Sequence, residues 1–247
     1  MERKDFLRNS LGIIGAGSLV IACGKSSVSP SGSGTGTSTG GTTTGSSSCV
    51  VSPTEVEGPY PYPGGEINNP LQRVDITGGQ TGVPLNMTLT VVNANNACAA
   101  VSGARVDIWY CNKDGYYSGY GNQPGLLGTK SYLGETWLRG YQLSDSNGQV
   151  KFSGIYPGWY SGRATHIHVE VFVNNVLVKT TQMAFPETIS DTVHTSSLYA
   201  AHGINTTRNT ADNIFGNSAT DLANQTMSLT GDTTNGYTGT YKIGISI

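Results

Sequence analysis

Four side chains in the middle of the chain have the types and spacing of a metal site. His166 and His168 lie in a run of β-branched residues, and Tyr117 and Tyr160 each lie in a turn marked by glycine. Because side chains alternate between the faces of a strand, both imidazoles point the same way and can chelate one ion. A phenolate is a hard anionic donor that suits a small, highly charged ion. The set predicts one non-haem Fe(III) per chain.

Two other kinds of metal site would use part of this set. Copper or zinc enzymes of the superoxide dismutase type also carry His-x-His on a β-sandwich, but this chain has four histidines in all, too few for a bridged two-metal centre. A facial triad of His166, His168 and Glu170 satisfies the alternation of a strand. It leaves the two tyrosines without a role, so the ferric site is preferred.

Several other tyrosines lie close to the two candidates in the sequence. Tyr117 is preferred because it has the spacing Gly-x-Tyr-Ser, and Tyr160 because it has the spacing Pro-x-x-Tyr. The neighbours that we assign to packing are Tyr110, Tyr116, Tyr120 and Tyr156.

The elements that must position these residues are short β-strands separated by turn residues. No segment has the apolar period of a long helix, and only weak helical signals occur, at residues 211–215 and 219–223. With 34 glycines in the chain, this pattern predicts an all-β fold, an antiparallel, immunoglobulin-like β-sandwich with long loops and little helix. The predicted strands are residues 85–92, 105–110, 149–152, 166–173, 177–183 and 237–247.

The first 48 residues have the composition of an export signal and a linker. Basic residues precede an apolar run at residues 11–22 that is too short to span a bilayer. The run ends in Val-Ile-Ala-Cys23, which resembles a bacterial lipobox, so residues 1–22 are predicted to be a lipoprotein signal peptide. Residues 23–48 are then a lipid-bearing cysteine and a disordered Ser/Gly/Thr tether. The expected location is outside the cytoplasm, anchored to a bacterial membrane.

The export signal has two alternatives that the sequence leaves open. An ordinary secretory signal would lack the lipid on Cys23. The segment Arg3-Lys4-Asp5-Phe6-Leu7 resembles a twin-arginine signal in which lysine replaces one arginine, so the export route and the membrane leaflet are not determined.

The remaining residues, 49–247, are enough for one hydrophobic core. The formal net charge of the chain is only −2, so nucleic acid is not an expected partner. The oligomeric state is left open.

Three cysteines follow the tether, and an exported location permits one disulfide among them. If residues 85–93 and 105–111 form a hairpin, Cys98 lies near its turn and Cys111 at its far end, beyond disulfide reach. Cys49 is then the expected partner of either one.

Five motifs occur in a fixed order between residue 49 and the C-terminus. They are Glu57-Gly-Pro-Tyr60, Gly103-Ala-Arg-Val-Asp-Ile-Trp109, Asp114-Gly-Tyr-Tyr117-Ser118, Ile155-Tyr-Pro-Gly-Trp-Tyr160 and Arg163-Ala-Thr-His166-Ile-His168. The series resembles the core of the intradiol ring-cleavage dioxygenases, the family of catechol and protocatechuate 3,4-dioxygenases. The resemblance implies a transthyretin-like β-sandwich, non-haem Fe(III), and O2-dependent cleavage of a catechol-type diol to a cis,cis-muconate-type product.

The resemblance also implies a role for each site residue. Tyr117 would stay bound to iron, whereas Tyr160 would leave it when the diol binds. Arg163 and Gln182 would lie beside the reacting ring. The other implied roles are those of the nitrogen ligands, His166 and His168, and of the pocket walls, Pro59 and Tyr60.

A transthyretin-like surface binding module without metal is the non-enzymatic alternative. Residues 101–109 and 144–152 would also suit such a module, and fold alone does not separate the two. The ligand set does, because a binding module does not need it. The substrate stays open among catechol, a substituted catechol, hydroxyquinol and a lignin-derived diol, because only five residues separate Tyr160 from His166 and give no pocket shape.

Overall fold

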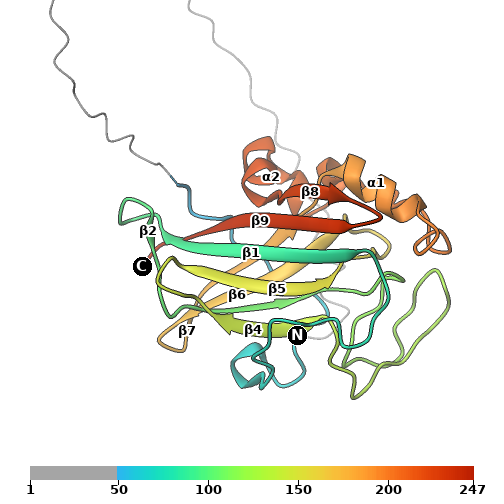
Figure 1. Cartoon of the computed structure of the whole chain (residues 1–247), viewed down its shortest axis with the longest axis horizontal. Coiled ribbons are helices and arrows are strands. Elements are labelled where there is room, and N and C mark those ends of the chain that lie inside the picture. The colour runs from blue at the N-terminus through green and yellow to red at the C-terminus, as the bar shows by residue number, and fades with distance from the viewer. Residues whose placement is uncertain (1–48) are drawn as a thin grey trace, which may run out of the picture. The chain divides into compact units, whose positions relative to one another are not determined.

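The computed structural model describes residues 49–247, and the predicted signal peptide and tether fall outside this range. Two β-sheets face each other within it (Figure 1). The first sheet contains β1 (Pro84–Asn93), β2 (Ala99–Ala100), β5 (Gln149–Ile155), β8 (Ser228–Asp232) and β9 (Gly236–Ile245). The second contains β3 (Arg105–Trp109), β4 (Arg139–Leu143), β6 (His166–Val173) and β7 (Val176–Ala184), in the order β4-β3-β6-β7. The predicted all-β sandwich is confirmed.

Helices are few and short in the described part of the chain. The α-helices are α1 (Glu187–Thr195) and α2 (Ala219–Gln225), and the 3-10 turns are η1 (Glu66–Asn68), η2 (Asn209–Ala211) and η3 (Phe215–Asn217). Helix α2 agrees with a weak signal in the sequence, and the Ser218 side chain caps it by accepting from the Asp221 amide. Helix α1 was not predicted, because its nine residues include only two large apolar side chains, Ile189 and Val193. None of these helices has the length and apolarity needed to cross a membrane.

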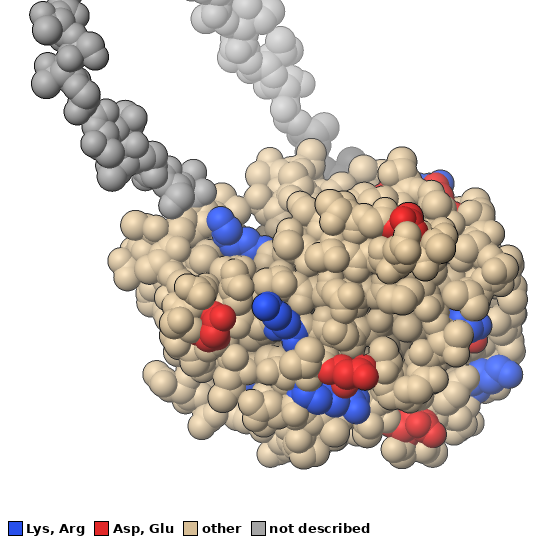
Figure 2. Space-filling view, in the orientation of Figure 1, with Lys and Arg blue, Asp and Glu red and all other residues tan. Residues whose placement is uncertain are grey.

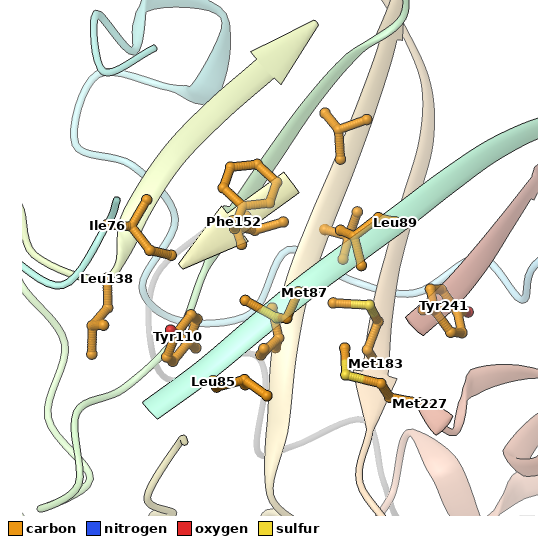
Figure 3. Close-up of a cluster of buried hydrophobic side chains, with 14 of the residues drawn as sticks. Ile76, Leu85, Met87, Leu89, Tyr110, Leu138, Phe152, Met183, Met227 and Tyr241 are labelled. Carbon is orange, nitrogen blue, oxygen red and sulfur yellow. The ribbon is translucent and has the colours of Figure 1, made fainter. Parts of the chain in front are cut away.

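The core lies between the two sheets and follows strand alternation. Every second side chain of β1 from Leu85 to Val91 is buried, and β6 contributes Ile167, Val169 and Val171 from the opposite sheet. Figure 3 shows apolar side chains of both sheets meeting in this space. Full burial of each such side chain contributes about 1.5–3 kcal/mol.

Strand β6 is buried on both faces. Its residues from His166 to Phe172 are all buried, although only Ile167, Val169 and Val171 face the core between the sheets. The alternate side chains, including His166 and His168, therefore point to the outer face of this sheet. That face is covered by connecting segments instead of a third sheet.

The pairing of β1 differs from the sequence expectation in two ways. Strands β1 and β3 belong to different sheets, so the hairpin considered for residues 85–93 and 105–111 does not form. Instead β1 pairs antiparallel with β5 and parallel with β9, so the sandwich is not wholly antiparallel. Two strands show the same alternation of apolar residues whether they pair in one sheet or face each other across the core. The sequence pattern alone therefore could not distinguish these two arrangements.

Charged side chains are few on the face of the domain seen in Figure 2. Some of its positive and negative groups adjoin each other, and no patch of a single sign is visible. The electrostatic field over this face is consequently weak.

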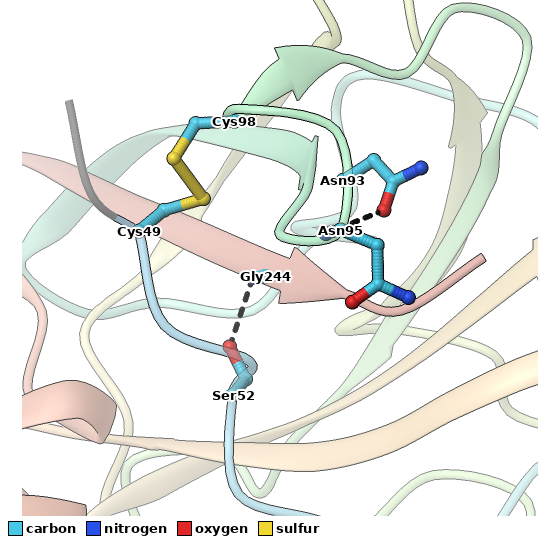
Figure 4. Close-up of a disulfide and its surroundings, with 6 residues drawn as sticks. All are labelled: Cys49, Ser52, Asn93, Asn95, Cys98 and Gly244. Atoms are coloured by element: carbon cyan, nitrogen blue, oxygen red, sulfur yellow. Dashed lines mark hydrogen bonds between the residues drawn. A yellow bond between two sulfur atoms is a disulfide. The ribbon is translucent and has the colours of Figure 1, made fainter. Parts of the chain in front are cut away.

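A disulfide joins Cys49 to Cys98 and ties the start of the described domain to the turn after β1 (Figure 4). The sequence predicted Cys49 as one partner and left Cys98 and Cys111 as alternatives for the other, and the structure pairs Cys49 with Cys98. Beside it Ser52 bonds twice to Gly244 of β9, through its amide (2.9 Å) and its hydroxyl (3.0 Å). Cys111 is free and buried.

We predict that this disulfide stabilises the domain measurably. It links cysteines separated by 49 residues, and such cross-links typically contribute about 2–4 kcal/mol by restricting the unfolded chain. Reductant should therefore lower the thermal unfolding temperature of the wild type by roughly 5–15 °C. The double variant Cys49→Ser/Cys98→Ser should have the unfolding temperature of the reduced wild type, and reductant should not change it. An unchanged wild-type temperature, with reduction verified by thiol titration, would contradict the prediction.

Candidate metal centre

The fold brings the four predicted ligands to one end of the second sheet. His166 and His168 are at the start of β6 on its outer face. Tyr117 lies in the connection from β3 to β4, and Tyr160 in the connection from β5 to β6. The first connection begins at this end, because Trp109, the last residue of β3, pairs with His168, and the second leads directly into His166.

The donor atoms of these four residues form one cluster, in which each donor lies within contact distance of at least one other. The Tyr117 hydroxyl is 3.0 Å from Nε2 of His168 and 3.4 Å from Nε2 of His166. The Tyr160 hydroxyl is 3.3 Å from His166 Nε2, and the two Nε2 atoms are 3.1 Å apart. Atoms that share one small cation at bonds of about 2 Å have this mutual spacing. The arrangement therefore fits a single metal ion.

The histidines are in the form that a metal requires. The Ala164 carbonyl lies 2.6 Å from Nδ1 of His166, so Nδ1 carries the proton and Nε2 presents its lone pair to the centre. Burial, and next the charge of Arg163, lower the pKa of both His166 and His168 well below its usual range. Both rings are consequently neutral, which leaves their nitrogens free to bind a cation.

The tyrosines point to a cation of high charge. Burial raises the pKa of Tyr117 well above its usual value and that of Tyr160 to about 12, although Arg163 opposes the rise in both. These phenols keep their protons unless a cation replaces them. A strongly charged ion such as Fe(III) is better able to do this than a divalent one.

Tyr117 is held more rigidly than Tyr160. The Gln123 side chain accepts from the amide of Tyr117 (2.8 Å) and donates to its carbonyl (2.7 Å). The Tyr117 side chain is fully buried, whereas Tyr160 is half-buried. Gln123 was not predicted, because its amide contacts backbone groups and belongs to no recognisable motif.

The two tyrosine-bearing turns pack directly against each other. The Gly158 amide donates to the Asn112 carbonyl (3.2 Å). Gly115 has a φ of +83°, and a side chain there would overlap the carbonyl oxygen of Trp159. Glycine at both positions therefore lets the backbones approach closely enough to bring the two phenols together.

Arg163 and Gln182 lie beside the four candidate ligands. Nη1 of Arg163 is 3.4 Å from the Tyr160 hydroxyl and 3.5 Å from His166 Nε2. Its Nη2 donates to Oε1 of Gln182 at 2.6 Å. Gln182 is placed by the sheet, because it pairs with His168 across β6 and β7.

Of the two predicted pocket residues, Tyr60 contacts the candidate ligands. Its ring stacks on Tyr117 at 4.8 Å and meets Tyr160 edge-on at 6.5 Å. Its carbonyl accepts from Nη2 of Arg139 (3.0 Å), a buried residue that the sequence analysis did not identify. Pro59 is exposed beside Tyr60.

The alternative metal sites lack their ligands. Within residues 49–247 the one group of three or more His, Cys, Asp or Glu side chains with ligand spacing is Glu57, Glu66 and Glu170, so no carboxylate joins the two histidines in a facial triad. Burial, and next the charges of Glu66 and Glu57, raise the pKa of Glu170 to about 8. The remaining histidines lie elsewhere, His194 near the Pro157 carbonyl and His202 against Trp159.

Tyr156, the neighbour of Tyr160 that we assigned to packing, lies away from the candidate ligands. The Tyr156 hydroxyl lies 2.9 Å from the Ser190 hydroxyl, inside the main core. Tyr156 is therefore a packing residue, as expected.

Comparison with known proteins identifies a family for this chain. The model of the Dioxygenase family matches residues 56–218. An intradiol ring-cleavage dioxygenase from Tetranychus urticae is 29% identical, with a TM-score of 0.69 over 80% of this chain and 95% of that one. The dioxygenase domain of a carbohydrate-binding fusion protein from Streptomyces sp. SirexAA-E is 25% identical, with a TM-score of 0.57 over 80% and 99%. No protein with a curated description matches the sequence.

A more distant likeness shows the fold alone. The 3-chlorocatechol 1,2-dioxygenase of Rhodococcus opacus 1CP is 17% identical, with a TM-score of 0.52 over 79% of this chain and 72% of that one.

The family match covers more than half of the chain, and this chain belongs to the intradiol ring-cleavage dioxygenase family. It is accordingly an enzyme, and the binding-module alternative is not supported.

Gly58 allows the segment before Tyr60 to lie against a candidate ligand. Its φ is +84°, and an added Cβ would lie 2.6 Å from Cε1 of His168. Gly64 has a similar φ of +95°, but nothing lies within 4 Å of its Cβ position. Both glycines therefore have a positive φ that favours glycine, but only at Gly58 would a side chain collide with His168.

We predict that Gly58→Ala weakens metal binding and that Gly64→Ala does not. Both changes introduce backbone strain of roughly 1–2 kcal/mol, but only the first displaces the His168 imidazole. Ferric affinity, measured by competition with a chelator, should fall about 10–100-fold in Gly58→Ala. Equal affinities in the two variants would show that the contact with His168 does not matter.

Proposed function

We propose that this enzyme binds one non-haem Fe(III) through Tyr117, Tyr160, His166 and His168 and uses O2 to cleave a catechol-type aromatic diol between its hydroxyl-bearing carbons, giving a cis,cis-muconate-type product. The observation that carries the proposal is the convergence of two phenols and two neutral imidazoles, each donor atom lying 3.0–3.4 Å from at least one of the others. When bound, ferric iron would act as a Lewis acid that holds the diol in its deprotonated form and activates its ring toward O2.

Tyr160 is suited to leave the site and accept a proton from the diol. It is half-buried and lies in a loop, and its pKa is about 12, so its phenolate is strongly basic. A departing phenolate that takes one of the two diol protons would be replaced by a diol monoanion of the same charge, which avoids a change of net charge in a buried site. Tyr117, fixed by Gln123, would remain in place.

Arg163 is suited to stabilise negative charge on the bound ring. Its guanidinium lies 3.4 Å from the Tyr160 hydroxyl, beside the position that the departing phenol would vacate. A fixed cation in a buried site stabilises developing negative charge more than it would in water. Gln182 and the ring of Tyr60 would hold the aromatic substrate in orientation.

The first test is the visible spectrum and iron content of the domain, residues 49–247. The proposal predicts stoichiometric iron and a tyrosinate-to-Fe(III) charge-transfer band that shifts when catechol is added without O2. Admission of O2 should then consume catechol and release a muconate-type product. A colourless protein that takes up no iron even after ferric reconstitution would leave a metal-free function as the better reading.

A pair of tyrosine variants sharpens this test. Tyr160→Phe should alter the charge-transfer band and lower kcat by roughly 100-fold or more, because a ligand and a proton acceptor are both lost. Tyr156→Phe is the matched control, because it removes a hydroxyl bonded to Ser190 in the core, worth about 1 kcal/mol of stability. It should keep the band and the activity. The reverse pattern would show that Tyr156, and not Tyr160, is the ligand.

We also propose that the chain is exported and anchored by lipid on Cys23. The lipobox-like sequence supports this, and the disulfide between Cys49 and Cys98 suits an oxidising compartment. In a bacterial host the full chain should fractionate with membranes and incorporate labelled fatty acid, and Cys23→Ser should do neither. Membrane association that persists in Cys23→Ser would exclude the lipid anchor.

A further inference from the structure

Asp212 is a buried carboxylate next to the candidate site, and the proposed chemistry does not use it. It lies between η2 and η3, with 2% of its surface exposed. Its Oδ2 is 2.8 Å from Nε of Arg163, and the two side chains are 0% and 11% exposed. A buried charge of this kind needs a full set of partners to be tolerated.

The carboxylate has that full set, and it comes from two parts of the chain. Oδ2 accepts from Nε of Arg163 and from the Ala164 amide (2.6 Å). Oδ1 accepts from the amides of Ile214 (2.7 Å) and Phe215 (3.3 Å). Asp212 is therefore fixed in position by its own loop, and it in turn fixes the loop that precedes β6.

The contact with Nε determines where the rest of the guanidinium points. A guanidinium is planar, so fixing its Nε sets the directions of both terminal nitrogens. Nη2 then donates to Gln182, and Nη1 faces the Tyr160 hydroxyl and His166. Without the carboxylate, Arg163 would keep its charge but lose this fixed orientation.

The same chain of contacts continues past Arg163. The bond from Nη2 to Oε1 of Gln182 settles which way its amide faces, and Nε2 then donates to the Val56 carbonyl at 2.9 Å. Val56 leads into Gly58, which lies against His168. Asp212 thus stands at one end of a buried chain that passes through Arg163 and Gln182 to the segment covering the candidate ligands.

We propose that Asp212 is a positioning residue for ring cleavage. It holds the Arg163 guanidinium in the orientation in which it contacts both Gln182 and the phenol of Tyr160. This inference rests on the proposed function. Asp212 does not touch the reacting atoms, and its effect is exerted through Arg163.

The test compares two Asp→Asn variants of the iron-loaded enzyme. Asp212→Asn removes the buried partner of Arg163, whereas Asp191→Asn removes the partner of Arg208 in a pair at the same distance, 2.8 Å, but 32–43% exposed. Exposed pairs contribute little to stability. We expect kcat per bound iron to fall about 10–100-fold in Asp212→Asn with little change in KM, because an interaction of the transition state is lost. Asp191→Asn should match the wild type.

Two further readouts separate positioning from general stability. The charge-transfer band of the catechol complex should shift in Asp212→Asn and not in Asp191→Asn. If Asp212 acts through Arg163, the double variant Asp212→Asn/Arg163→Lys should be no slower than Arg163→Lys alone. Additive losses in kcat, or a band identical to the wild type, would overturn the inference.

A measurement on the wild-type protein without iron needs no variant to fold. The Nε proton of Arg163 should exchange with solvent far more slowly than that of Arg208, whose side chain is 43% exposed. Equal exchange rates would overturn the inference even if the enzyme is active. A wild type that binds no iron and cleaves no diol would instead overturn the proposed function, and the role of Asp212 in it as well.

Discussion

The site depends on one constraint, the burial of β6 on both of its faces. One face supplies Ile167, Val169 and Val171 to the core, and the other presents the two imidazoles of the candidate site. Covering that outer face requires the long connections that carry the tyrosines and the segment around Gly58. The connections that cover this face therefore also carry the two tyrosines, so the dry environment and the donor set form together.

That environment decides the protonation states on which the proposed chemistry rests. Burial keeps both histidines neutral and both phenols protonated, and Arg163 acts in the direction that favours phenolate and neutral imidazole. The pocket without a cation thus holds no net charge on its four donors. Its affinity for a cation comes from lone pairs and from phenolic protons that the cation can displace. The paired Arg163 and Asp212 add a fixed dipole beside this neutral set.

The sequence predicted those parts of the site that follow from local pattern. Strand alternation places His166 and His168 on one face, and the turn motifs identify Tyr117 and Tyr160, all of which the fold brings together. Asp212 could not be found in this way, because it lies 49 residues from Arg163 and belongs to no repeating pattern. The pairing of β1 was beyond reach for a related reason, since alternation records which side of a strand is buried and not which strand lies beside it.

The segment from Cys49 to Tyr60 shows why stability and site geometry are not separate in this molecule. Its first part is hydrogen-bonded to both sheets. The Ser52 hydroxyl accepts from the amide of Gly244 in β9, and the Ser52 carbonyl accepts from the buried Lys179 of β7. It ends with a ring stacked on Tyr117. A segment without regular secondary structure has few bonds of its own, so its path is set by these outside contacts. The contacts that close the edge of the sandwich therefore also determine where the wall of the candidate site stands.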